Sequence, residues 1–576
     1  MRRHRRIFAR PQLVATAAFM LGCARVRPAE APAPAGGVYD IVIENGRIVD
    51  GSGAPWFYGD VAVRGDRIVA ITPRGGTGGA TALERIDARG MIVAPGFIDI
   101  QGQSGGALLR GDGRLVSMVA QGVTTSILGE GSTPAPLSAQ MLAAQDARDT
   151  VALRWAQAFA GPRGFDAWLR GMESHGISVN VGSFVGAATL RQFGMGMAQG
   201  AATGTALDSM RAAARRAMQD GAFGVASALI YPPGEFATTG ELVAIAREIS
   251  PYGGLYITHM RSEGDKLLEA IDEALRIGRE GGVPVELYHL KAAGVRNWPR
   301  GTQAIAKIDS ARAAGQDIQA DMYPYTAGGT GLTGCLPPWS AADGKLFDNL
   351  ANTDVRAKMR AEMEHPTTDW ENLCELATPP NVLITALNGP RYRQYAGKRL
   401  AEIAAAEGKD WIETAMDLIL AERRRVETIY FIMSEDNVRL NLRQPWIKIG
   451  TDAGGYDPDS TRSLVHPRSY GTFPRILGHY VRDEKLMPLE EAVRKMTSAT
   501  ATRLSLPDRG LLKTGTFADI VVFDPATIAD RATYEQPHQL SVGMRDVFVN
   551  GKAVMRNGRH TNAKPGRALR GPGYRA

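Results

Sequence analysis

Eight short apolar runs recur through the middle of this 576-residue chain, and each is long enough for one buried strand. Helix-like segments separate most of them. In residues 264–281, for example, the apolar positions recur at steps of three and four. Eight strand–helix units predict an α/β chain folded as a (β/α)8 TIM barrel, in which functional side chains gather at the C-terminal ends of the strands. The runs cover residues 91–100, 123–130, 177–186, 222–231, 254–260, 283–290, 317–325 and 446–452.

Both ends of the chain carry a different pattern. Residues 39–93 and 507–565 contain short alternating strands, with expected turns at Asn45-Gly46 and Asn550-Gly551. We therefore expect a small β-sandwich built from both ends, which leaves residues 94–506 for the barrel.

A long segment precedes the last barrel strand. About 120 residues separate the last two apolar runs, far more than an ordinary connection needs. We predict an insertion at about residues 329–430 that folds over the mouth of the barrel. It contains Cys335 and Cys374, and an oxidising compartment would allow one disulfide between them.

The first residues predict export. A basic stretch precedes an apolar run, residues 13–21, that is too short to span a bilayer, and Cys23 follows at a site that resembles a lipoprotein cleavage box. We expect a signal peptide at 1–22, an Ala/Pro linker at 23–38 and a periplasmic or cell-envelope location, with attachment to the membrane through a lipidated Cys23. The alternative is a disordered basic leader.

The net charge does not indicate a nucleic-acid partner. Five arginines lie in the first ten residues, so cleavage before Cys23 lowers the charge from +7 to 7 − 5 = +2. The other basic cluster lies in a Gly/Pro-rich segment at the C-terminus, and we expect residues 566–576 to form a basic tail.

Ionisable side chains lie where several predicted strands end. His259, His289 and a carboxylate offer three ligands and leave a fourth position for water, as in a catalytic zinc site. Zinc lowers the pKa of a bound water, and Asp452 could act as the base that takes its proton. The alternatives are structural histidines at the strand ends, a turn-forming Asp452 before two glycines, and a Glu130 that only caps the next helix.

The first strand end departs from this pattern. A two-metal hydrolase of this layout would carry His-x-His there, but the chain has Gln101 and Gln103. Neutral amides are poor zinc ligands beside imidazole. The two glutamines therefore indicate a degenerate second-metal position, and we expect one Zn²⁺ per chain.

Four long blocks of the sequence resemble the N-acyl-D-amino-acid deacylases, or D-aminoacylases, of the amidohydrolase superfamily. The resemblance extends from Asp40 to about Arg570 and implies a TIM barrel, a two-ended β-sandwich and an insertion before the last strand. The blocks are THMRSEGDKLLEAIDEALRIGREGGVPVELYHLKAAG, ADMYPYTAGGTGL, IKIGTDAGG and VHPRSYGTFPRILG.

The resemblance also implies roles for individual residues. His259 and His289 match the zinc ligands, Glu130 stands where the best-known members have a bridging Cys, and Asp452 matches the catalytic Asp. Arg468, Lys291 and Tyr323 match contacts to the substrate carboxylate, and Tyr325 is expected close by. In this family the second metal is thought dispensable, so Gln101 and Gln103 need not abolish activity. A serine common in the substrate pocket is Gly329 here.

Together these features predict zinc-dependent hydrolysis of N-acyl-D-amino acids, giving a carboxylate and a D-amino acid. The expected partner is a small molecule with a free carboxylate; the sequence does not predict an oligomeric state. One alternative is an amidohydrolase acting on a dipeptide or another linear amide. The other is a non-catalytic binding protein of the envelope, suggested by Gln101, Gln103 and by Ala187, which stands where the family commonly has the His of a Gly-His pair.

Overall fold

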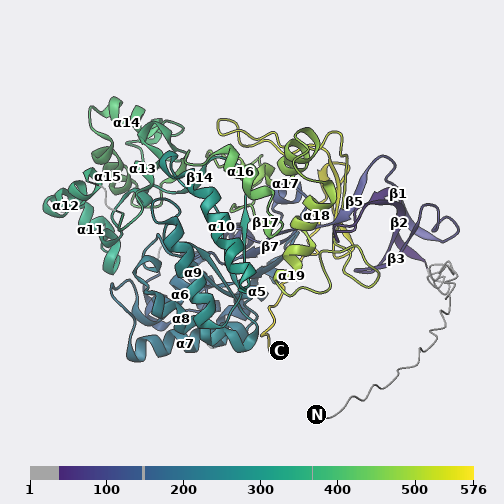
Figure 1. Ribbon diagram of the computed structural model, residues 1–576, viewed down its shortest axis with the longest axis horizontal. Helices are drawn as coiled ribbons and strands as arrows, with labels where there is room; N and C mark the ends of the chain where they lie inside the picture. Colours follow the sequence, from purple (N-terminus) through teal and green to yellow (C-terminus); the bar gives the residue numbers. More distant parts are fainter. Residues whose placement is uncertain (1–37, 146–148, 162, 366–367) are drawn as a thin grey trace, which may run out of the picture. The chain divides into compact units, whose positions relative to one another are not determined.

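Eight parallel strands form a barrel at the predicted places in the sequence (Figure 1). The computed structural model describes residues 38–145, 149–161, 163–365 and 368–576, so the predicted leader and residues 23–37 of the linker lie outside the described residues. The strands are β6 (Phe97–Asp99), β7 (Val123–Leu128), β8 (Asn180–Ser183) with its continuation β9 (Val185–Gly186), β10 (Gly224–Ala228), β11 (Leu255–His259), β12 (Val285–Leu287), β13 (Ile318–Met322) and β17 (Ile447–Ile449).

Hydrogen bonds join these strands into a closed barrel. One set runs β6-β7-β8 and the other runs β9-β10-β11-β12-β13-β17. A parallel bridge between Gly102 and Ala453, just beyond β6 and β17, connects the first strand to the last. The barrel therefore has no free edge, and its strand ends form a single rim.

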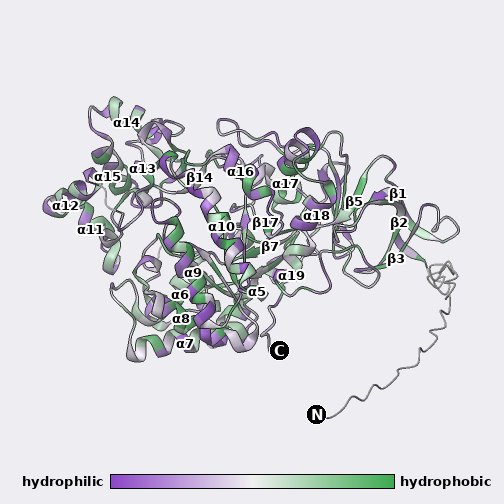
Figure 2. Ribbon diagram, viewed as in Figure 1, coloured by the Kyte–Doolittle hydropathy of each residue, from purple (hydrophilic) through white to green (hydrophobic). Residues whose placement is uncertain are grey.

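Amphipathic helices cover the outside of the barrel. In α9 (Leu267–Gly281), Leu267, Ile271 and Ala274 are buried on one face, and Gly282 ends the helix with a left-handed φ of 68°. Figure 2 shows the same alternation of hydrophobic and hydrophilic residues on the outer helices. Among the described residues, the structure contains no helix that combines the length and the apolar character needed to cross a membrane.

The two ends of the chain build one β domain. The pairing of β5 with β18, for example Val93 with Val522, joins the N-terminal strands to the C-terminal ones in a single nine-stranded sheet. Side chains from both arms, including Ile43 and Phe548, share a core. The strands are β1 (Tyr39–Ile48), β2 (Phe57–Arg64), β3 (Arg67–Pro73), β4 (Ala82–Asp87), β5 (Ile92–Pro95), β18 (Ile520–Phe523), β19 (Met544–Val549), β20 (Lys552–Arg556) and β21 (Arg559–His560).

The two Asn-Gly pairs behave differently. Asn550 and Gly551, both with positive φ, form the predicted hairpin turn between β19 and β20. The turn predicted at Asn45-Gly46 is wrong, because β1 continues through it with a shift in register against β2. Asn45 has a φ of 64° and its backbone N–H donates to Asp60, which fits a β-bulge inside a long strand.

The predicted basic tail is part of the folded structure. The backbone N–H of Leu569 donates to the carbonyl of Val181 on β8 at 2.7 Å. The guanidinium of Arg570 lies 2.7 Å from the carboxylate of Asp166, which is fully buried. Because its backbone and charges are paired with the barrel, this segment is not a free tail.

The insertion forms its own small unit at the predicted place. Strands β14 (Gly328–Gly331) and β15 (Val382–Ile384) both pair antiparallel with β16 (Glu427–Tyr430). Cys335 and Cys374 are joined by a disulfide and belong to a separate hydrophobic core. The helices of this unit cluster together in Figure 1; they are α11 (Leu346–Ala351), α12 (Thr353–Glu364), α13 (Leu373–Ala377), α14 (Leu400–Glu407) and α15 (Trp411–Glu422).

Candidate metal and active site

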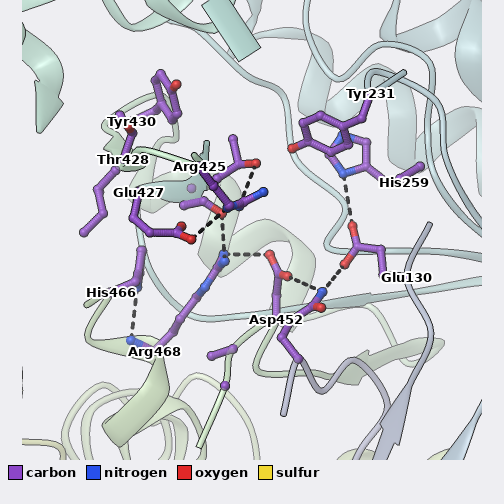
Figure 3. Close-up of a pocket in the computed structure, with 18 of the residues that line it drawn as sticks. Glu130, Tyr231, His259, Arg425, Glu427, Thr428, Tyr430, Asp452, His466 and Arg468 are labelled. Atoms are coloured by element: carbon purple, nitrogen blue, oxygen red, sulfur yellow. Dashed lines mark hydrogen bonds and ion pairs between the residues drawn. The ribbon is translucent and has the colours of Figure 1, made fainter. Parts of the chain in front are cut away.

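A cavity of about 790 Å³ opens at the C-terminal rim of the barrel (Figure 3). Glu130, His259, His289 and Asp452 line it from the strand ends, as the sequence predicted. The insertion supplies another wall, which includes Thr428 of β16. The barrel rim and the insertion therefore enclose one site.

Three donor atoms converge in this cavity. His259 Nδ1 lies 3.0 Å from His289 Nε2, and Glu130 Oε1 lies 3.3 Å from the first and 3.2 Å from the second. Ligands about 2.0–2.1 Å from a tetrahedral zinc are separated by roughly 3.3 Å. The three atoms therefore have the spacing of ligands to one metal ion, and Glu130 lies with the two histidines.

The charges around these atoms favour a cation. Burial acts to raise the pKa of Glu130, but its hydrogen bonds with His259 and His289 bring that pKa well below its usual range. Burial and Lys291 act to lower the pKa of His289, whereas Glu263 and Glu130 raise it, and the result is a pKa of about 10. The carboxylates of Glu263 and Glu130 therefore surround the imidazoles with negative charge, which favours a bound cation.

The two glutamines contact the other oxygen of Glu130. Gln101 Nε2 donates to Glu130 Oε2 at 2.7 Å, and Gln103 Nε2 donates to the same atom at 2.6 Å. Because a carboxylate only accepts hydrogen bonds, the amide nitrogens must be the groups that face it. The predicted degenerate position is therefore filled by two N–H donors, which cannot bind a metal.

Asp452 is held in a strained conformation beside the donor atoms. Its φ is 49°, in the left-handed region that costs a non-glycine residue about 1–3 kcal/mol. Its backbone N–H donates to the carbonyl of Gln101 at 2.7 Å, which connects the last barrel strand to the first. Burial raises the pKa of Asp452, although Arg468 opposes the shift. A buried carboxylate with a raised pKa is suited to accept a proton.

The substrate contacts predicted from the resemblance fall partly in the cavity. Arg468 begins α17 (Arg468–Arg475), and its guanidinium lies 4.6 Å from the centre of the Tyr323 ring. Both residues line the cavity, as does Lys291. Lys291 is already paired, because its Nζ donates to Glu263 at 2.6 Å.

Tyr325 lies close by, as expected, next to His466. Among the described residues, Tyr325 is not part of the cavity lining. Its ring packs against His466, with centroids 5.4 Å apart, and its hydroxyl donates to Asp530 at 3.4 Å. His466 lines the cavity itself, so Tyr325 contacts a lining residue without being one.

Glu263 is the main site residue that sequence reasoning missed. Its Oε1 lies 2.9 Å from His289 Nδ1 and 2.6 Å from Lys291 Nζ. For His289 Nε2 to offer a lone pair to a metal, Nδ1 must carry the proton; Glu263 is the acceptor within reach, and Lys291 Nζ lies 2.8 Å from the same nitrogen. The residue lies four positions after His259 in the same block, so its place beside a strand-end histidine was the available signal.

Tyr231 and Arg425 were also missed. Tyr231 packs beside His259, with ring centroids 5.4 Å apart, and Arg425 donates to Thr330 at 3.2 Å and to Glu427 at 2.8 Å (Figure 3). Arg425 lies within the insertion, where the sequence gives no strand-end pattern to mark a site residue.

A closed barrel, a three-donor metal site at its rim and an adjacent carboxylate base define a metal-dependent hydrolase. The amidohydrolase family model matches residues 392–555. A D-aminoacylase from Alcaligenes xylosoxydans xylosoxydans is 36% identical over 533 residues, which cover 92% of this chain and 97% of that protein. The chain belongs to the D-aminoacylase family of amidohydrolases.

Solved structures agree with this assignment. One is a D-aminoacylase described in terms of one-metal activation and second-metal attenuation of a binuclear centre; it is 34% identical, with a TM-score of 0.76, and the match covers 92% of this chain and 100% of that one. Another is an N-acyl-D-glutamate deacylase from Bordetella bronchiseptica with zinc and a phosphonate inhibitor. It is 33% identical, with a TM-score of 0.74, and the match covers 93% of this chain and 100% of that one.

Proposed function

We propose that the chain hydrolyses the amide bond of N-acyl-D-amino acids, with one zinc ion, and releases a carboxylate and a D-amino acid. The observation that carries the proposal is the presence of three metal-ligating atoms, a carboxylate base and a buried guanidinium in one cavity. The relatives named D-aminoacylase and N-acyl-D-glutamate deacylase support the substrate class.

Glu130, His259 and His289 would hold the zinc. When bound there, the metal lowers the pKa of a water molecule and polarises the carbonyl of the amide. Glu263 keeps His289 in the tautomer that leaves Nε2 free, through its contact with Nδ1 at 2.9 Å. Each of these groups is largely buried, so the ligands are held in place before substrate arrives.

Asp452 takes a proton from the attacking water and delivers it to the leaving nitrogen. Its Oδ1 accepts a hydrogen bond from Gln103 at 3.2 Å, and its Oδ2 lies 2.7 Å from Arg468 Nη1. These two contacts fix the plane of the carboxylate. A positioned base of this kind contributes about 10²–10⁴-fold to the rate.

Arg468 binds the free carboxylate of the substrate. Its planar guanidinium suits a bidentate pair, and it is 5% exposed, which strengthens a charged contact. Burial raises the pKa of Tyr323, so its hydroxyl stays protonated and can donate to the same carboxylate. Lys291 Nζ lies 5.9 Å from the centre of the Tyr323 ring and adds positive charge.

The test is a substrate profile of the purified, zinc-loaded protein. We expect hydrolysis of N-acetyl-D-amino acids, followed as release of the free amine, and no hydrolysis of the matching L-compounds. Hydrolysis of dipeptides or other linear amides without any activity on the D-series would contradict the proposal and would support the alternative substrate class.

We further propose that the protein is exported and attached to the membrane through Cys23. The leader sequence and the disulfide between Cys335 and Cys374 support an oxidising compartment. Membrane fractionation of cells that express the full chain or Cys23→Ser tests this. The full chain should sediment with membranes and the variant should be released; equal behaviour of both would contradict attachment through Cys23.

A further inference from the structure

We infer that Gln101 and Gln103 close the second metal position and restrict the site to a single ion. This inference rests on the proposed function only in assuming that Glu130, His259 and His289 hold the first ion. The two oxygens of Glu130 have different partners. Oε1 faces the imidazoles of His259 and His289, and Oε2 faces the side-chain amides of the two glutamines.

The amide contacts saturate the second oxygen. A carboxylate oxygen has two lone pairs, and Oε2 accepts one short hydrogen bond from Gln101 and one from Gln103, at 2.7 and 2.6 Å. Hydrogen bonds to an ionised acceptor are about twice as strong as neutral ones. A second cation would have to break both and would then meet N–H groups, which repel it.

The backbone that carries both amides is held by hydrogen bonds. Gln101 is 1% exposed, its N–H donates to Asp99 at 3.2 Å, and its carbonyl accepts from Asp452. The backbone N–H of Gln103 donates to the carbonyl of Ala453 at 2.9 Å. Both side chains therefore leave from backbone that is fixed to the last barrel strand.

Gln103 also links the metal ligand to the base. Its Nε2 donates to Glu130 Oε2 and lies 3.2 Å from Asp452 Oδ1. Gln103 thus connects the two carboxylates through one amide nitrogen and acts as a positioning residue for Asp452.

Zinc stoichiometry tests the inference. The mature protein is stripped with a chelator, incubated with a tenfold excess of zinc, desalted and analysed for metal; calorimetric titration gives an independent count. We expect one zinc per chain for the wild type and two for Gln101→His with Gln103→His, which supplies two imidazoles beside Glu130 Oε2.

Gln192→His is the matched control, because Gln192 lines the same cavity but its side-chain amide contacts Met197 rather than Glu130. It should bind one zinc. Two ions in the wild type would overturn the inference, and so would one ion in a double variant that keeps the native circular-dichroism spectrum. If the double variant does not fold, the wild-type count decides. The count needs no substrate, so its outcome is separate from a failure of the proposed deacylase activity.

Discussion

Arg468 Nη1 and Asp452 Oδ2 lie 2.7 Å apart in a buried ion pair, with 6% and 13% of their side chains exposed. The pair joins the residue that we assign to substrate binding and the residue that we assign to proton transfer. Arg468 acts against burial and lowers the pKa of Asp452. A substrate carboxylate that shares the guanidinium weakens this effect, so substrate binding itself makes Asp452 a stronger base.

Asp452→Asn should remove catalysis and leave the metal in place. The amide cannot accept the proton, so we expect kcat on an N-acetyl-D-amino acid to fall by about 10²–10⁴-fold. Because Asp452 is not one of the three converging ligands, the zinc content should remain that of the wild type. Asp457→Asn is the control and should keep its activity. Asp457 follows β17 as Asp452 does, but its carboxylate is paired with Arg114. An unchanged kcat in Asp452→Asn would show that Asp452 is not the base.

The acid limb of the kcat/KM profile should report the ionisation of Asp452. The base works in its ionised form, so kcat/KM rises as the pH increases through its pKa, which burial places above 3.8. Arg468→Met removes the group that lowers this pKa. The acid limb of the kcat/KM profile should therefore move to higher pH, and the maximal kcat/KM should fall. Arg475→Met, on the same helix but paired with Asp530, should leave the limb in place. A limb that does not move in Arg468→Met would contradict the coupling.

Glu263→Gln should weaken metal binding. An amide at this position accepts the Nδ1 proton of His289 less strongly and no longer neutralises Lys291, which lies 2.6 Å away. Loss of such a contact to a metal-binding histidine typically costs about 10–100-fold in metal affinity. Competition with a chromogenic chelator measures the zinc Kd, and Glu269→Gln on the exposed face of α9 is the control. An unchanged zinc Kd would show that Glu263 does not orient His289.

The barrel strands and the candidate metal ligands could be predicted because the strands appear as apolar runs and the ligands stand where those runs end. Each barrel strand is a short apolar run, and the side chain that ends it lies on the rim whichever neighbour it meets. His259, His289 and Asp452 could therefore be assigned to one site from their positions alone. The insertion could be found for a similar reason, since its length exceeds any ordinary connection.

Contacts that depend on side-chain direction could not be predicted. Nothing in the pattern says that Gln101 and Gln103 turn their amides toward Glu130, or that Glu263 reaches His289. Tyr323 and Tyr325 flank Pro324 and both pack on His466, yet only Tyr323 of the two lines the cavity, which the sequence pattern could not show. The ordered C-terminus escaped prediction because its hydrogen bonds are made by backbone and by distant partners such as Asp166.

The disulfide between Cys335 and Cys374 should account for much of the stability of the insertion. It closes a loop over a sequence separation of 39 residues, for which the chain-entropy model gives about 4 kcal/mol. The insertion has its own hydrophobic core, so the loss should appear as an earlier unfolding transition of this unit. This transition is measured by urea unfolding, with limited proteolysis within residues 328–430 as the probe.

Two comparisons separate the stability that comes from the disulfide bond from the stability that comes from packing of the two sulfur atoms. Reductant breaks the bond and keeps both buried sulfurs, whereas Cys335→Ala with Cys374→Ala also removes the sulfur atoms from the core. We expect the wild type to lose stability on reduction, and the double variant to be less stable still and insensitive to reductant. A wild type whose unfolding midpoint does not change with reductant would show that the bond does not stabilise the insertion. The wall that Thr428 and Arg425 contribute to the cavity would then depend on hydrophobic packing alone.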